Sequence, residues 1–68
     1  MTWQELKEEA KKMGYNLFES VNYKVADWIA TPNNDWSFES DGTIMNDGVV
    51  LATDRTPDQM LAIMKALQ

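Results

Sequence analysis

Two carboxylates, Asp27 and Glu39, are the residues of this sequence whose types and spacing best fit chemistry. They flank a turn at Pro32–Asn34, and one register of the resulting hairpin places them side by side on neighbouring strands. A carboxylate pair can carry out general acid–base catalysis when the pKa of one member is raised. Because such catalysis also needs a cleft, which a chain of 68 residues seldom forms, we expect two solvated acids and keep a small Asp/Glu enzyme as an alternative.

Other reaction chemistry is poorly supported because the sequence contains no cysteine and no histidine. Nucleophile–base pairs of the usual kinds, thiolate or imidazole metal sites and disulfides are thereby excluded. The three glycines are isolated, so there is no phosphate-cradling loop, and the acidic turns lack the spacing of a calcium loop. We therefore expect no cofactor, no metal and no small-molecule ligand, and a protein that is not an enzyme.

The negative charge of the chain, −5 in total, is concentrated in its middle. There, seven acids stand against only Lys24 and Arg55. The acids are Glu19, Asp27, Asp35, Glu39, Asp41, Asp47 and Asp54. This distribution argues against nucleic-acid and anionic-membrane partners, both of which require clustered lysine and arginine. No apolar run is long enough to span a membrane, no secretory leader is visible, and the absence of cysteine favours a cytoplasmic location.

Two helices are predicted, at residues 2–13 and 57–67. Each begins at a threonine, Thr2 or Thr56, that opens a Thr-x-x-Glu or Thr-x-x-Gln capping box. Apolar residues recur at helical spacing through both segments. Gly14 suits the position that follows the first helix.

The middle of the chain is predicted to form strands joined by tight turns, because β-branched and aromatic residues alternate with Asn, Asp and Gly clusters. The predicted strands lie within 21–31, 36–39 and 49–53, and 15–20 is ambiguous. Turn signals lie at Pro32–Asn34, Asp41–Gly42 and Asn46–Gly48.

Two registers compete in the first hairpin. In the one that we favour, Trp28 lies opposite Phe38 and Ala30 opposite Trp36, so the aromatic side chains share one face. A slip of one residue would instead place Ile29 opposite Phe38 and send Trp28 to the other face.

These elements predict an α+β fold class: helix, antiparallel meander of three or four strands, helix, with both helices packed on one face of the sheet, in a single domain over residues 1–68. The order of elements is similar to that of double-stranded-RNA-binding domains. In that family a lysine cluster opens the second helix, whereas this sequence has Thr56-Pro57-Asp58-Gln59. The resemblance is therefore one of element order, and no nucleic-acid partner is implied.

A core of this size stabilises a fold by only about 3–5 kcal/mol, so packing alone, or packing with a partner chain, must hold the protein together. At least two of the tryptophans, Trp3, Trp28 and Trp36, are expected to anchor the core. Apolar residues nevertheless fall on both faces of the predicted strands, and an apolar patch on a second face is typical of a partner surface.

We therefore expect a small non-catalytic protein-interaction module, which binds a protein partner or forms a homodimer through a sheet face or an edge strand. Its candidate partner surface comprises Trp28, Ile29 and Val50, with Asp27 and Glu39 as acidic neighbours. An acidic nucleic-acid mimic that inhibits a basic protein is a further alternative.

Overall fold

The computed structural model describes all 68 residues and contains two helices and a five-stranded sheet. The elements are, in chain order, α1 (Trp3–Lys12), β1 (Asn16–Phe18), β2 (Trp28–Ala30), β3 (Trp36–Glu39), β4 (Ile44–Asn46), β5 (Val49–Ala52) and α2 (Pro57–Ala66). The predicted α+β class and the helix–sheet–helix order are confirmed. The predicted number of strands, three or four, is too low. The ambiguous segment 15–20 contains β1, and an additional strand, β4, lies between the strands predicted at 36–39 and 49–53.

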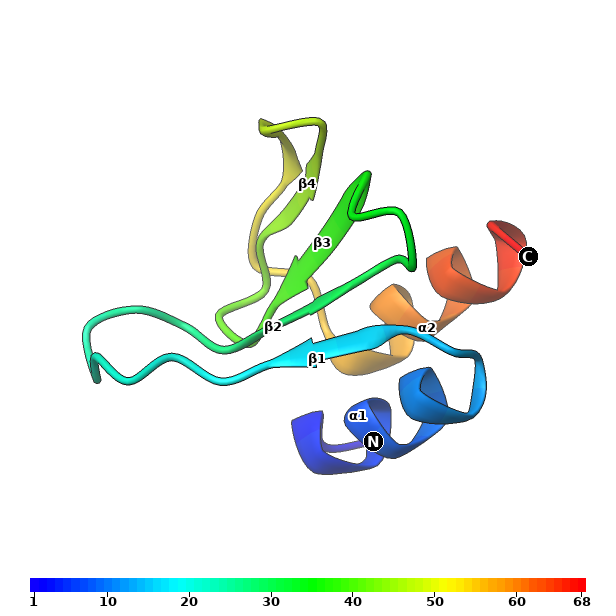
Figure 1. The fold of residues 1–68 in the computed structure, drawn as a ribbon, viewed down its shortest axis with the longest axis horizontal. Helices are drawn as coiled ribbons and strands as arrows, with labels where there is room; N and C mark the ends of the chain where they lie inside the picture. The colour runs from blue at the N-terminus through cyan, green and yellow to red at the C-terminus, as the bar shows by residue number, and fades with distance from the viewer.

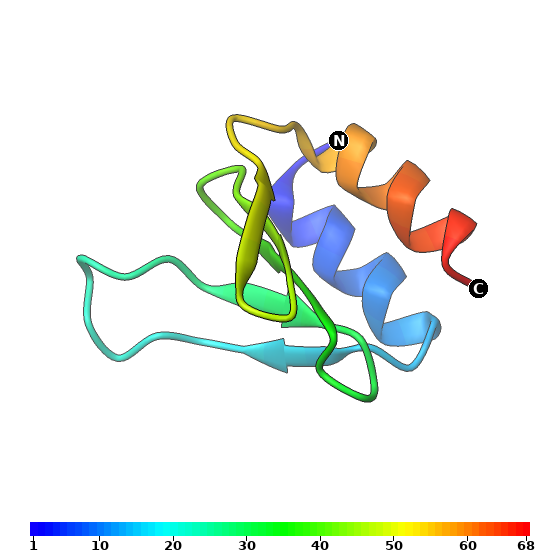
Figure 2. The ribbon, with the colours of Figure 1, turned by 90° about the horizontal axis from the view of Figure 1, so that it is seen from above.

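The sheet is an antiparallel meander in the order β1-β2-β3-β4-β5, so β1 and β5 are its two edges. Figures 1 and 2 show α1 and α2 side by side on one side of this sheet. We call the sheet face toward the helices the core face and the opposite face the outer face. The segment between β1 and β2, residues 19–27, extends away from the body as a long arm (Figure 1). Neither ten-residue helix has the length and apolar character needed to cross a membrane.

Both helices begin with the predicted capping boxes. The Thr2 hydroxyl accepts a hydrogen bond from the backbone N–H of Glu5, and the Thr56 hydroxyl accepts one from that of Gln59. In turn, the side chains of Glu5 and Gln59 accept hydrogen bonds from the backbone N–H groups of the two threonines. The first helix ends at Lys12 with Met13 as its C-cap, and Gly14 follows, as predicted, with a left-handed φ of 84°. These local bonds satisfy backbone groups that helix ends otherwise leave unpaired, so the helix boundaries follow from local sequence.

The register of the β2–β3 hairpin is the slipped one, and the register that we favoured is wrong. Ile29 pairs with Phe38 and Trp28 with Glu39. The reason is a four-residue loop between Thr31 and Trp36, where the prediction assumed an odd number of loop residues. Both ends of the loop are bonded, because the N–H of Thr31 donates to the carbonyl of Trp36 and the Thr31 hydroxyl accepts from the N–H of Trp36.

One hydrophobic cluster holds the helices and the sheet together. Its buried members are Leu6, Ala10, Tyr15, Ile29, Phe38, Ile44, Met60 and Met64. Trp3 and Trp36 pack against this cluster, in agreement with the expectation that two tryptophans anchor the core. Trp28, in contrast, points to the outer face.

Tyr15 links the end of α1 to the end of α2. It is buried, and its hydroxyl donates a 3.1 Å hydrogen bond to the carbonyl of Met64. That carbonyl belongs to the last turn of α2, where its backbone donor is the N–H of the C-cap residue Leu67, at 3.3 Å. Burial raises the pKa of the Tyr15 phenol above its ordinary value.

Replacing Tyr15 with phenylalanine should lower the free energy of unfolding by about 1 kcal/mol, because the Met64 carbonyl loses its side-chain hydrogen bond and keeps only the longer one from Leu67. The wild-type protein should also lose stability as pH rises above about 10, since its phenol ionises more readily in the unfolded state, and Tyr15→Phe should remove this loss. Urea titrations at neutral and alkaline pH measure both effects. Tyr23→Phe, on the exposed arm, is the control and should leave the neutral-pH value unchanged.

Gly42 fixes the β3–β4 turn against the segment that enters α2. Its backbone has a left-handed φ of 98°, and its carbonyl accepts a 2.9 Å hydrogen bond from the N–H of Arg55. A β-carbon at this position would lie 2.8 Å from the Arg55 nitrogen and 2.9 Å from the Asp54 α-carbon. Only glycine therefore allows the two backbone segments to approach this closely.

Gly42→Ala is expected to destabilise the protein by about 3 kcal/mol, from left-handed strain and backbone overlap together. Gly14→Ala isolates the strain, because Gly14 also has a positive φ but has open space around it, and should cost about 1 kcal/mol. Chemical denaturation of the two variants compares them directly. Equal losses would mean that the close approach at Gly42 contributes nothing.

Candidate interaction surface

The structure divides the five residues of the predicted partner surface. Trp28 and Glu39 are half-buried on the outer face, and Val50 is exposed on β5. Asp27 lies at the base of the arm. Ile29 is fully buried in the core cluster, which corrects its predicted place on the surface. The cause is the register, because pairing with Phe38 turns Ile29 toward the helices.

The two carboxylates proposed as a catalytic pair are not side by side. The carbonyl of Asp27 accepts the N–H of Ser40, so Asp27 lies opposite Ser40, and its carboxylate accepts a 2.9 Å hydrogen bond from the N–H of Ser20. Glu39 lies opposite Trp28. Residues one apart in the ladder point to opposite faces of a sheet, so these carboxylates diverge. Asp27 instead closes the base of the arm.

Glu39 has an altered electrostatic environment. Burial, with a smaller contribution from the charge of Asp41, raises the pKa of the Glu39 carboxyl above its ordinary value. No group of three or more acidic side chains is arranged to hold a metal ion. The acidic group whose charge reaches Glu39 is therefore Asp41, in the turn that follows β3, and not Asp27.

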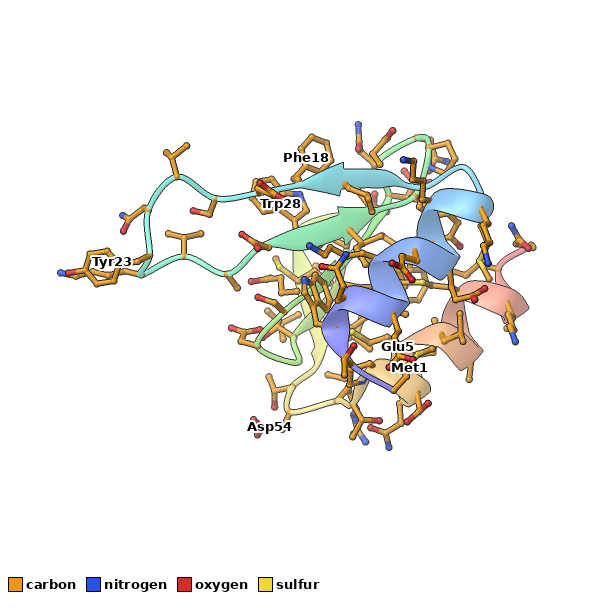
Figure 3. All side chains as sticks on the ribbon, turned by 90° about the horizontal axis from the view of Figure 1, so that it is seen from below. Met1, Glu5, Phe18, Tyr23, Trp28 and Asp54 are labelled. Carbon is orange, nitrogen blue, oxygen red and sulfur yellow. The ribbon has the colours of Figure 1, made fainter.

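Aromatic packing organises the outer face near β1 and β2. The rings of Phe18 and Trp28 stack with centroids 5.0 Å apart and an interplanar angle of 12°. Figure 3 shows the two rings together where the arm leaves the sheet. Phe18 is exposed and no helix covers this face, so the stack presents apolar surface to the outside. Sequence reasoning identified Trp28 here but not its partner Phe18.

The edge strand β5 is the most exposed apolar segment within the sheet. Its side chains Val49, Val50 and Leu51 are 60%, 53% and 56% exposed. We call these three residues the aliphatic edge. A register irregularity opposite Ile44–Met45 leaves Leu51 without a partner on β4. Only Ala52 of this strand packs against the core cluster.

The arm is a second exposed apolar feature, and sequence reasoning missed it. Its side chains Val21, Tyr23 and Val25 are exposed, and Tyr23 lies at its far end (Figure 3). The alternation of these three residues resembles that of a strand, and the sequence analysis assigned them to one. The Ser20 hydroxyl instead donates to the carbonyl of Asn22 and accepts from its N–H, and the Asn22 side chain accepts from the N–H of Lys24, so the segment forms local turns.

A shallow hollow lies between the C-terminal end of α2 and the β2–β3 loop. Apolar side chains Met13, Tyr15, Pro32, Trp36 and Leu67 contribute to its lining, with polar atoms of Thr31, Asn33, Asp35 and Gln68. It is wide open and contains no pair of acidic and basic groups, so it offers no evident reaction centre.

Comparison of the chain with protein-family models, curated proteins and solved structures finds no match.

Glu39→Gln should raise the melting temperature more at about pH 7 than at about pH 3.5. The reason is that a carboxyl with a raised pKa stabilises the fold fully only while protonated, and this contribution is lost as pH rises through the raised pKa. Thermal unfolding at the two pH values tests the difference. Glu19→Gln removes the same charge at an exposed position and is the control; an equal pH-dependent gain there would refute the role of burial at Glu39.

Proposed function

We propose that this protein is a small non-catalytic interaction module that binds another protein chain through the aliphatic edge and the neighbouring outer face. The observation that carries the proposal is the exposure of Val49, Val50 and Leu51 on an uncovered sheet edge. Unpaired edges accept additional strands, and contiguous exposed apolar patches mark partner surfaces.

The core of this protein is small. Fully burying one aliphatic side chain stabilises a fold by about 1.5–3 kcal/mol, and only 11 of the 68 residues are buried. A chain with so small a core forgoes a large fraction of its stability by leaving three consecutive aliphatic residues outside. A partner that covers them would recover this free energy on binding.

The two sheet edges differ in the way that a binding role requires. The β1 edge runs beside α1, where Lys7, Lys11 and other polar side chains border Leu17 and Phe18. Lysines beside an edge strand discourage pairing with other chains. The β5 edge has no lysine and no proline, so only one edge lacks this protection.

Catalysis is not part of the proposal, since Asp27 and Glu39 point to opposite faces. The acidic nucleic-acid mimic remains an alternative prediction from the charge of the chain. Salt distinguishes the two functions, because affinity from charge mimicry should fall steeply with salt and affinity from the aliphatic edge much less. The cytoplasmic location stays a prediction.

The test compares wild-type protein with a variant in which Val49, Val50 and Leu51 are all replaced by threonine. Threonine preserves β-propensity at all three positions, and side-chain shape at the two valines, while removing apolar surface, so the variant should fold and lose association. Light scattering over a wide concentration range measures self-association, and affinity capture at low and high salt measures binding to other proteins. The proposal predicts that the wild-type protein self-associates or captures other proteins, and that the variant does so much less.

The matched control is Val21→Thr with Val25→Thr, which removes exposed aliphatic surface from the arm instead. If the arm variant loses association and the β5 variant keeps it, the binding surface is the arm and the assignment to β5 is wrong. If both variants associate as wild type does, the apolar surface has no binding role.

A further inference from the structure

We propose that β5 binds an extended segment of a partner protein by antiparallel strand addition, and that this segment has aliphatic residues at alternate positions and lysine or arginine at its C-terminal end. The inference rests on the proposed function and specifies the partner and the geometry of binding.

The hydrogen-bond alternation of the sheet identifies the free backbone groups. The turn between β4 and β5 has two residues, Asp47 and Gly48, both with positive φ, as in a type I′ hairpin. Its closing pair, Asn46 and Val49, is therefore hydrogen-bonded, and the next pair, Met45 and Val50, is not.

The hydrogen bonds between β3 and β4 lead to the same assignment of the free backbone groups. The N–H of Glu39 donates to the carbonyl of Thr43, so bonded pairs of β3 and β4 recur at every second residue and include Ser37 with Met45. Met45 thus directs its backbone groups to β3. Val50 consequently directs both its N–H and its C=O away from β4, to the open edge, where an antiparallel strand can bond both.

The side chains at this edge specify the apolar part of the partner. Val50 shares the outer face with Met45, its ladder partner, and both are accessible. Val49 and Leu51 flank it and are more than half exposed. Because side chains alternate along a strand, Val49 points to the face opposite Val50. An added strand with aliphatic residues at alternate positions would extend the row of Met45 and Val50 on the outer face.

The charges beside β5 indicate which end of the partner segment carries basic residues. The turn before β5 carries Asp47, whose N–H donates to the carbonyl of Asp35, so two acids lie at the beginning of the strand. Both are exposed, and neither takes part in an ion pair. At the other end, Asp41 and Asp54 lie close to Arg55, which offsets one of the two negative charges, so the net negative charge there is smaller. The C-terminal end of an antiparallel added strand meets the uncompensated acids, and basic residues fit there.

A second copy of the chain fits this edge less well than a basic segment does. It would bring the same acidic turn and a further net charge of −5 to the interface. The edge strand has only four residues, which is short for the roughly 1,200 Å² that a stable specific interface buries. Both considerations favour a basic partner segment over a homodimer.

The test is an NMR titration of the labelled protein with the peptide acetyl-Thr-Val-Thr-Val-Thr-Lys-Lys-amide. We expect amide shifts confined to β5 and its flanks. The same peptide ending in Glu-Glu should bind about fivefold more weakly at low salt, and the difference should shrink as salt is added. A peptide methylated on the backbone nitrogen of its second valine, the middle residue, should bind with about tenfold lower affinity, because this nitrogen can no longer donate a hydrogen bond to β5.

Val50→Pro tests the edge from the side of the protein. Proline removes the outward N–H and is tolerated at edge positions where that N–H is not bonded within the sheet, so the variant should fold and bind about tenfold more weakly. Val21→Pro makes the same change on the arm and should bind as wild type does. Should Val50→Pro fail to fold, the methylated peptide gives the same answer with the unaltered protein.

Three results would overturn the inference: no shifts at millimolar peptide, equal binding of the methylated and unmethylated peptides, or tighter binding of the Glu-Glu peptide. If the peptide fails while capture by the wild type still depends on the aliphatic edge, strand addition is wrong and the interaction function stands. A dimer that dissociates on Val50→Pro would replace the basic partner with a second copy.

Discussion

The pairing of Ile29 with Phe38 is the constraint on which the rest of the structure depends. Both residues are fully buried, and together they define which face of the sheet meets the helices. Because side chains alternate along a strand, this one pair sends Trp28 and Glu39 to the outer face and separates Glu39 from Asp27. The same alternation, carried across β3 and β4, decides which backbone groups of β5 are free. A slip of one residue would exchange core and surface throughout the sheet.

Local sequence predicts the helices and the turns of this fold but does not determine the register of the β2–β3 hairpin. The helix boundaries follow from capping threonines, and the turns at Asp41–Gly42 and Asp47–Gly48 follow from residues that tolerate positive φ. The β2–β3 loop contains no glycine. Its length is set by the Thr31 hydroxyl, which bonds two loop neighbours, and by a left-handed Asn34. Adjacent asparagines are compatible with loops of several lengths, so the sequence could not distinguish four residues from three or five.

The candidate site was predictable to the same limit. Apolar residues on both faces of the strands indicated a second surface, and Trp28 and Val50 lie on it. Ile29 was placed on the wrong face, and Asp27 was wrongly paired with Glu39, because both predictions depend on the register. The arm was missed for a different reason. Val21, Tyr23 and Val25 alternate as strand residues do, and only the hydrogen bonds of Ser20 and Asn22 show that the segment forms local turns instead. Phe18 belongs to a three-residue strand whose pairing with β2 creates its stack on Trp28, so its role arises from tertiary contact.

The composition of β5 supports the proposed role in binding another chain more than a role in stabilising the fold. The strand contributes Ala52, a small and half-buried side chain, to the packing around the core, and exposes its three larger aliphatic residues. Forming it nevertheless costs backbone entropy of about 1–2 kcal/mol per residue. A surface strand selected only to cover Ile44 would be served equally well by threonine at the exposed positions, with less risk of unwanted pairing. Retaining Val49, Val50 and Leu51 beside an acidic turn, on the edge without lysines, is therefore the pattern expected of a strand that meets another chain.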